Sequence, residues 1–286
     1  MAFTSFRRVC QTAGTALSNG YLSVFLTHKL NNSMTKGFCV PILNCYSCPL
    51  ALFSCPIGTI QHFAAFHVFP FYPLALLGLV GILVGRMSCG WICPFGLVQD
   101  LLYKVKLPKF DFNPNLGYIK YLVLLVFVFA LPYQTGELWF SKLCPSGTLF
   151  ASIPWFVWNP IDPGTGQPTL PGGPGVIFYV DLILLAIFLA WFMVTKRPFC
   201  RIFCPLGAIF SLFNKISFIQ LKVDHACDGC ERCESLCPVG INVHKTPNSP
   251  DCIRCLECVA CEHVSVTTAA PFPKDSFAKN IARDLE

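Results

Sequence analysis

Residues 227–261 read CDGCERCESLCPVGINVHKTPNSPDCIRCLECVAC, and this cysteine pattern decides the fold of the C-terminal part of the chain. The stretch contains two runs of three cysteines, each followed by one further cysteine. In bacterial two-cluster ferredoxins, the fourth cysteine of one run binds the other cluster. The pattern therefore predicts one [4Fe–4S] cluster on Cys227, Cys230, Cys233 and Cys261, and a second on Cys252, Cys255, Cys258 and Cys237.

Zinc and disulfide bonds are the alternatives for this stretch. Zinc sites usually combine CxxC pairs across a longer gap, whereas triplets with two-residue spacing favour iron–sulfur binding. The second run departs from the bacterial pattern, because only two residues separate Cys258 from Cys261 and Glu262 follows where proline is usual.

The rest of the chain has the composition of a membrane protein. Of its 286 residues, 54% are apolar and 13% are charged, whereas a soluble domain carries about a quarter charged residues. The net charge of +6 is concentrated near predicted membrane edges, so it indicates topology rather than nucleic-acid binding. No signal-peptide cleavage site follows Arg7–Arg8, and we expect residues 10–28 to be a retained membrane helix.

Four stretches are apolar enough to span a membrane, for which about 20 residues are needed. They are residues 10–28, 70–87, 117–133 and 175–195. We expect shorter re-entrant or interfacial helices at 57–69, 95–106 and 145–158, and a surface loop rich in proline and glycine at 159–175. Most lysines and arginines lie on the ferredoxin side of these spans, which predicts a multi-pass inner-membrane protein with a cytoplasmic ferredoxin.

A duplicated motif precedes the ferredoxin. Four copies of Cys-Pro-x-Gly begin at Cys55, Cys93, Cys144 and Cys204, each before a short apolar helix. Proline presets the first helical turn, and glycine allows close backbone approach. Two copies extend to Cys-x3-Cys-Pro-x-Gly, so two ligands from each half predict a third [4Fe–4S] cluster on Cys89, Cys93, Cys200 and Cys204.

A further set of cysteines lies on the opposite side of the membrane. We expect Cys45, Cys48, Cys55 and Cys144 to hold a fourth [4Fe–4S] cluster. Ordinary buried cysteines, a Cys45–Cys48 disulfide, and a copper or other soft-metal site are the alternatives. Of the 18 cysteines, Cys10 and Cys39 then remain outside the four sets.

Polar residues recur at one offset in the repeat. Gln61-His62 follow Cys55 as Gln99-Asp100 follow Cys93. A quinone site needs polar groups in an apolar cleft, so we expect these residues to bind quinone, with His62 or Asp100 transferring protons. The alternative is that they cap helices or reach lipid headgroups.

At these motifs the chain resembles the four-iron–four-sulfur membrane ferredoxins associated with quinol oxidation, typified by the Nap-type membrane subunit of the periplasmic nitrate reductase system. The nitrous-oxide-reductase regulator and the cytochrome-oxidase-associated copper reductase carry related modules. The match covers Cys89–Gly96, Cys200–Gly207 and the ferredoxin run, in the same order. The resemblance implies a membrane electron-transfer subunit that works beside a reductase or another redox partner.

The sequence as a whole predicts an all-α membrane bundle of about four transmembrane helices, with re-entrant or interfacial helices and a C-terminal two-cluster ferredoxin. We expect a membrane domain at 1–218 with repeats at about 40–110 and 117–215, a ferredoxin at 219–265, and a tail at 266–286. The predicted function is electron relay between a quinone pool and a redox protein or larger membrane complex, as a quinol dehydrogenase-type oxidoreductase subunit. A metal-reducing or assembly factor and a cluster-bearing structural subunit are the alternatives.

Overall fold

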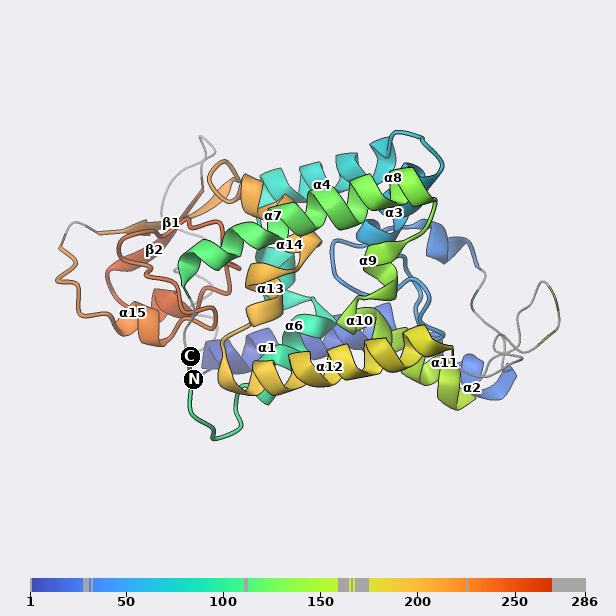
Figure 1. Cartoon of the computed structure of the whole chain (residues 1–286). Helices are drawn as coiled ribbons and strands as arrows, with labels where there is room; N and C mark the ends of the chain where they lie inside the picture. Colours follow the sequence, from blue (N-terminus) through green and yellow to red (C-terminus); the bar gives the residue numbers. More distant parts are fainter. Residues whose placement is uncertain are drawn as a thin grey trace.

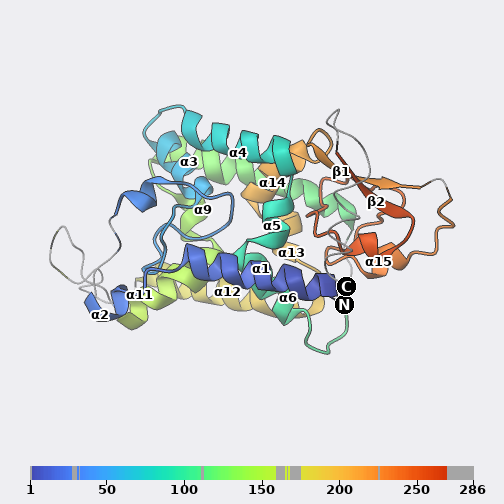
Figure 2. The ribbon, with the colours of Figure 1, turned by 180° about the vertical axis from the view of Figure 1, so that it is seen from behind.

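Two layers of helices run along the length of the molecule, with shorter helices between them (Figure 1). The computed structural model describes residues 2–27, 31, 33–110, 113–158, 165, 167, 175–224 and 226–268. One layer contains α4 (Phe71–Val84) and the continuous helix Asn115–Thr135, and the other contains α1 (Ala2–Ser18) and α12 (Val176–Val194). Figure 2 shows α1 from behind, where α6 (Pro94–Leu102) contacts both α1 and α12.

Short elements complete the helical part. The helix Asn115–Thr135 consists of the end of η2 (Pro114–Tyr118), then α7 (Ile119–Val123), η3 (Leu124–Ala130) and α8 (Leu131–Thr135). Further short helices are α2 (Val24–Thr27), η1 (Met34–Gly37), α5 (Met87–Trp91), α9 (Trp139–Lys142) and α13 (Pro198–Ile202).

Two of the four predicted spans are confirmed as long apolar helices. Among the described residues, Asn115–Thr135 and α12 are long and apolar enough to cross a membrane. The stretch predicted at 70–87 is present as the 14 residues of α4. The bounds predicted at 10–28 are wrong, because α1 ends at Ser18 and the Asn19 side chain bonds back to the carbonyl of Thr15. Asparagine and glycine at this point favour a helix end.

Every Cys-Pro-x-Gly motif begins a helix, as predicted. Proline is the first helical residue of α3 (Pro56–Ala65), α6, α10 (Pro145–Gly147) and α14 (Pro205–Phe213). Its missing N–H would have no partner in a first turn anyway. α10 continues through η4 (Thr148–Ser152) and α11 (Ile153–Trp158), so helices are confirmed within 57–69, 95–106 and 145–158. The predicted loop at 159–175 lies almost wholly outside the described residues.

The ferredoxin stretch forms a lobe at one end of the helices (Figure 1). β1 (Ile219–Val223) pairs antiparallel with β2 (Val264–Thr268), with Leu221 opposite Val266. This pairing joins the two ends of the stretch, and α15 (Arg232–Ser235) and η5 (Glu257–Ala260) lie between the strands. The part of the predicted tail beyond Thr268 lies outside the described residues.

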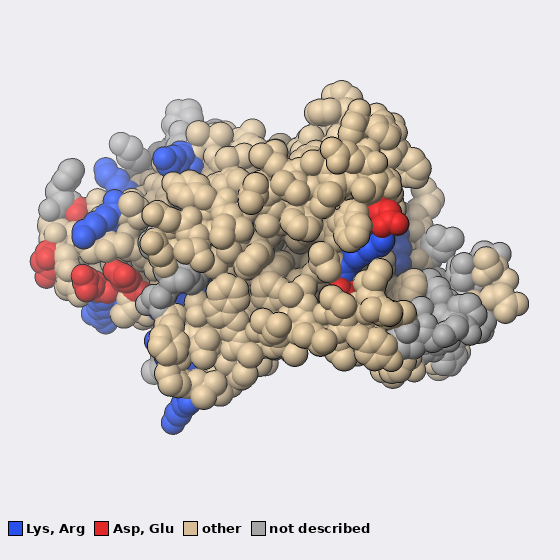
Figure 3. All heavy atoms as spheres, viewed as in Figure 1, with Lys and Arg blue, Asp and Glu red and all other residues tan. Residues whose placement is uncertain are grey.

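Charged side chains gather at the ferredoxin end of the face shown in Figure 3, and the middle of that face is almost free of them. Large apolar side chains are exposed along the long helices, among them Leu79, Leu122, Leu125, Ile183 and Ile187. An apolar exterior of this extent suits contact with lipid.

Candidate iron–sulfur sites

The inner set of cysteines (Cys89, Cys93, Cys200 and Cys204) is assembled from both halves of the repeat. All four side chains are buried. Cys89 and Cys200 lie in α5 and α13, while Cys93 and Cys204 precede the first turns of α6 and α14. The other three thiols all act electrostatically on Cys204, so the structure brings the four predicted ligands together.

Each of the two repeats contributes an arginine that donates a hydrogen bond to the backbone of the other repeat. Arg197 lies three residues before Cys200, and its Nη1 donates to the carbonyl O of Cys89 at 3.1 Å. Arg86 lies three residues before Cys89, and its Nη2 donates to the carbonyl O of Cys200 at 2.9 Å. The repeated unit is therefore Arg-x2-Cys-x3-Cys-Pro-x-Gly. Sequence reasoning missed these arginines, although their equal offset is the signal that identifies them.

The motif glycine makes room for the arginine of the other half. A Cβ on Gly207 would lie 2.7 Å from Arg86 Nη2, and one on Gly96 would lie 3.3 Å from Arg197 Nη1. The glycine N–H groups also face sulfur, since Gly207 N donates to Cys204 Sγ at 3.3 Å. The same backbone contact joins Gly96 to Cys93, Gly58 to Cys55 and Gly147 to Cys144. Free N–H groups at a helix start favour a negatively charged sulfur.

Buried cations outnumber carboxylates around the inner set. Among the residues that the structure describes, six cations there are at most 4% exposed: Arg7, Arg86, Lys120, Arg197, Arg201 and Arg254. Three carboxylates pair with five of them: Asp100, Asp251 and Glu257. An unpaired buried ion costs several kcal/mol, so this excess of positive charge among the described residues favours a bound anion.

A [4Fe–4S] cluster on four thiolates is such an anion, because the thiolate charges exceed that of the iron–sulfide core. The inner set therefore fits a cluster in both its ligands and its charge. Within the described part of the chain, no three His, Cys, Asp or Glu side chains converge on a position for a single metal ion. A cubane cluster bonds each thiolate to a different iron, so its ligands lie farther apart than those of one ion.

The second ferredoxin set packs against the inner set. Asn214 Nδ2 donates to the carbonyl O of Cys252 at 2.8 Å. Gly90 approaches Ile253 so closely that a Cβ on Gly90 would lie 2.5 Å from the Ile253 carbonyl O. Gly90 follows Cys89 and Ile253 follows Cys252, so these two predicted cluster sites are neighbours.

Carboxylates of the ferredoxin lobe pair with cations of the helical part. Asp251 Oδ1 lies 2.6 Å from Lys120 Nζ and 3.5 Å from Arg86 Nη1. Glu257 Oε1 lies 2.8 Å from Arg7 Nε. Burial raises the pKa of Asp251, but the neighbouring cations lower it more, and the result is a pKa below the ordinary value. Asp251 is therefore ionised at neutral pH and holds the lobe against the helices.

The two ferredoxin sets differ in exposure. Cys237, Cys252, Cys255 and Cys258 are all buried, and burial raises the pKa of Cys252 to about 11 and that of Cys258 to about 12. Cys252 and Cys258 therefore stay protonated at neutral pH unless a metal displaces the protons, which is how thiolate ligands bind iron. In the first set Cys233 and Cys261 are buried, Cys227 is half-buried and Cys230 is exposed. The first set therefore faces solvent.

Replacement of Gly90 by alanine should weaken the contact between the lobe and α5. The added methyl group would overlap the Ile253 carbonyl, and overpacking of this kind costs about 1–3 kcal/mol. We expect a lower thermal unfolding midpoint. Gly78→Ala is the matched control, because a Cβ at Gly78 meets nothing within 4 Å and alanine favours a helix by about 1 kcal/mol. An unchanged midpoint for Gly90→Ala would contradict this packing.

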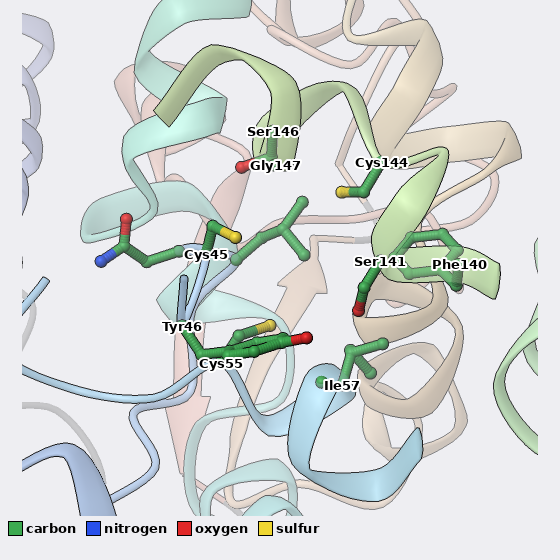
Figure 4. Close-up of a pocket in the computed structure, with 12 residues that line it drawn as sticks. Cys45, Tyr46, Cys55, Ile57, Phe140, Ser141, Cys144, Ser146 and Gly147 are labelled. Carbon is green, nitrogen blue, oxygen red and sulfur yellow. The ribbon is translucent and has the colours of Figure 1, made fainter. Parts of the chain in front are cut away.

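Three of the four outer cysteines share one cavity. Figure 4 shows the sulfur atoms of Cys45, Cys55 and Cys144 facing a common space. Cys48 does not line this cavity, and its Sγ lies 3.5 Å from Asn19 Oδ1. The cysteines of this set are free thiols. The structure thus brings three predicted ligands together and places the fourth to one side.

Unpaired polar atoms surround the outer cavity. Asn44 and Ser146 line it, and both amide atoms of Asn44 and the Oγ of Ser146 are buried without a hydrogen-bond partner among the described residues. Sequence reasoning missed Asp181, although it is the one charged residue of α12. Asp181 does not line the cavity, but it is 5% exposed and its Oδ1 has no hydrogen-bond partner among the described residues. Unpaired buried polar groups are costly, so Asn44 and Ser146 would stabilise a polar group bound in this cavity.

A wider pocket adjoins the outer cavity. It has a volume of about 650 Å³, and Cys45 and Tyr46 line both spaces. His62, Glu137 and Lys142 lie on its far wall, where Lys142 Nζ pairs with Glu137 Oε2 at 2.6 Å. Of the outer cysteines, Cys45 lines this pocket.

The residues predicted to bind quinone fall at two separate places. His62 lines the wide pocket, while the neighbouring Gln61 is buried and donates to Ser141 Oγ at 3.0 Å. The structure therefore leaves His62 as the one of this pair that faces an open space.

The other two predicted residues lie at the inner set. Gln99 Nε2 donates to Cys200 Sγ at 3.0 Å. Asp100 pairs with Arg197 at 2.5 Å and with Arg7 at 3.1 Å. Both side chains are engaged in contacts that hold the inner site together, far along the fold from His62.

Comparisons with known proteins agree with this geometry. The family model described as a 4Fe-4S binding domain matches residues 66–114 and 178–223, which contain the two Cys-x3-Cys-Pro motifs. An uncharacterized protein of Methanocaldococcus jannaschii is 30% identical over 217 residues, which cover 71% of this chain and 80% of that protein. No solved structure shows a significant match.

Two relatives with descriptive names are also similar to this chain. Ferredoxin-type protein NapH of Escherichia coli is 26% identical over 279 residues, which cover 88% of this chain and 84% of NapH. The regulatory protein NosR of Stutzerimonas stutzeri is 30% identical over 199 residues, which cover 64% of this chain and 24% of NosR. The resemblance inferred from the cysteine motifs is confirmed, and the chain belongs to the family of ferredoxin-type membrane proteins with a 4Fe–4S binding domain.

Proposed function

We propose that this chain is a membrane electron-transfer subunit that relays electrons through four [4Fe–4S] clusters between a quinone pool and a redox protein partner. The inner set carries the proposal, because four thiols from two repeats meet there among buried cations that lack a matching number of anions. Membership of the ferredoxin-type membrane family supports an electron-transfer role.

The order of the sites along the molecule suggests the order of transfer. The outer cluster would lie beside the wide pocket, and the inner cluster would lie next to the second ferredoxin cluster through the contact of Gly90 with Ile253. The first ferredoxin cluster, with its exposed ligand Cys230, would exchange electrons with the partner. Electrons can move along this order in either direction.

The proposed membrane arrangement has four crossing helices. α12 and Asn115–Thr135 would cross together with the shorter α1 and α4, which lie in the same two layers. Basic residues near the ferredoxin lobe support a cytoplasmic position for that end by the positive-inside rule. Residues 1–218 would then form the membrane domain, and residues from 219 onward the cytoplasmic ferredoxin.

The wide pocket is the proposed quinone site. Its volume of about 650 Å³ is in the range of small-molecule pockets, about 300–1,000 Å³. It offers His62 and Tyr46 as polar groups beside an outer ligand, Cys45. A quinone here would exchange electrons with the outer cluster.

Anaerobic stopped-flow measurement tests this function. Protein reduced with dithionite and freed from excess reductant should be reoxidised by a short-chain quinone. Ala65→Trp fills the pocket wall and should slow reoxidation about tenfold, which corresponds to about 1.4 kcal/mol in the barrier. Leu79→Trp is the control, because Leu79 is an exposed side chain of α4 away from the pocket. Clusters that stay reduced in the presence of quinone would contradict the proposal.

A metal-reducing or assembly role is the second candidate function. One observation favours it, namely that only Cys45, Cys55 and Cys144 share the outer cavity while Cys48 bonds to Asn19. Thiolate sets of this kind select copper(I). Metal analysis separates the two functions, because copper in place of iron at the outer set would favour this second one.

A further inference from the structure

Gln99 is the side chain that touches a ligand sulfur of the inner set most directly. It lies in α6 and is fully buried. Its Nε2 donates to Cys200 Sγ at 3.0 Å and to the carbonyl O of Phe95 at 3.3 Å. Its Oε1 is buried and has no hydrogen-bond partner in the described part of the chain. The amide nitrogen of Gln99 thus donates to sulfur, although the amide oxygen is left without a donor. A buried oxygen without a hydrogen bond usually lowers the stability of the fold.

This contact breaks the symmetry of the repeat. Gln99 stands six residues after Cys93, and the residue six positions after Cys204 is Phe210, which is fully buried and has no donor. Gln61 holds the same offset after Cys55 but donates to Ser141 Oγ rather than to a thiol. If Gln99 served only for packing or capping, an apolar side chain would do equally well, as Phe210 does at the equivalent position.

A donor on a ligand sulfur changes the energy of the two redox states unequally. The reduced cluster carries one more negative charge than the oxidised cluster, so the hydrogen bond stabilises it more and raises the reduction potential. Burial strengthens this effect, because hydrogen bonds are electrostatically stronger at low dielectric. No electron or proton is taken up by the glutamine itself.

We infer that Gln99 is a positioning residue that raises the reduction potential of the inner cluster through its hydrogen bond to Cys200. The inference rests on the proposed inner cluster. It assigns Gln99 a role different from quinone binding, since the side chain is buried against Cys200 and does not line the wide pocket. The inner cluster then accepts electrons more readily than a cluster without this donor.

Potentiometric titration followed by electron paramagnetic resonance tests the inference. The signal lost in Cys89→Ala first identifies the inner cluster in the full-length protein. Gln99→Met keeps the shape and removes the donor, and it should lower the ratio of reduced to oxidised inner cluster about tenfold at a fixed potential, a shift of about 59 mV for one electron. Gln61→Met is the matched control and should leave this potential unchanged.

A second variant keeps the test decisive if Gln99→Met assembles poorly. Phe210→Gln adds a donor at the equivalent position of the other half, where it would face Cys89, and it should raise the same potential. An inner-cluster potential that is unaffected in both variants would overturn the inference and leave the proposed function intact. A Cys89→Ala variant that loses no signal would instead overturn the inner cluster itself.

Discussion

Replacement of Cys200 by alanine should remove one complete cluster from the protein. A [4Fe–4S] cluster needs four thiolates, and the six buried cations around this site outnumber the three described carboxylates that pair with them. We therefore expect the loss of about four irons per chain and of one cluster spectrum. Iron analysis together with electron paramagnetic resonance of the dithionite-reduced protein measures both.

Cys10→Ala is the control for this experiment. Cys10 lies in α1, is half-buried and belongs to none of the four sets. Its replacement should leave the iron content and the spectra unchanged. Full iron content in Cys200→Ala would show that the inner thiols do not bind a cluster.

Replacement of Asp251 by asparagine should strongly destabilise the junction between the lobe and the helices. Asp251 neutralises Lys120, Arg86 and, at 4.0 Å, Arg201. Asparagine keeps the shape and removes the charge, and a buried ion pair that loses one partner costs about 3–5 kcal/mol. We expect this loss in unfolding free energy, and with it slower electron exchange between the inner and second ferredoxin clusters.

Glu137→Gln is the matched control for Asp251→Asn. Glu137 also pairs with a lysine at 2.6 Å, but its side chain is 52% exposed and that of Lys142 is 35% exposed. An exposed pair contributes about 0–1 kcal/mol, so this variant should unfold close to the wild type. Equal effects of the two substitutions, measured by thermal unfolding in the same detergent, would contradict the role given to Asp251.

Local patterns in the sequence predicted much of the helical framework. Proline after cysteine placed the starts of α3, α6, α10 and α14 correctly, because proline at a first helical position acts through its own backbone. The cysteine spacing likewise identified the family. The helix predicted at 10–28 has the wrong bounds because it was inferred from apolar composition. Asn19 and Gly20 within that stretch end α1.

Contacts between distant segments could not be predicted in this way. The hydrogen bonds of Arg86 and Arg197 to the opposite repeat depend on how the two repeats pack together. The sequence of a single repeat carries no information about that packing. The same is true of Asp251, which lies in the ferredoxin but neutralises cations of the helical part. Cys48 matched a ligand spacing, yet its position beside Asn19 depends on the packing of α1 against the loop.

Iron density in a structure of anaerobically purified protein is the most direct measurement of the central claim. The account predicts a compact cluster of four irons between Cys89, Cys93, Cys200 and Cys204, a short distance from the cluster on the Cys252 loop. Empty inner thiols beside filled ferredoxin sites would contradict it, and the protein would then be a ferredoxin attached to a membrane anchor.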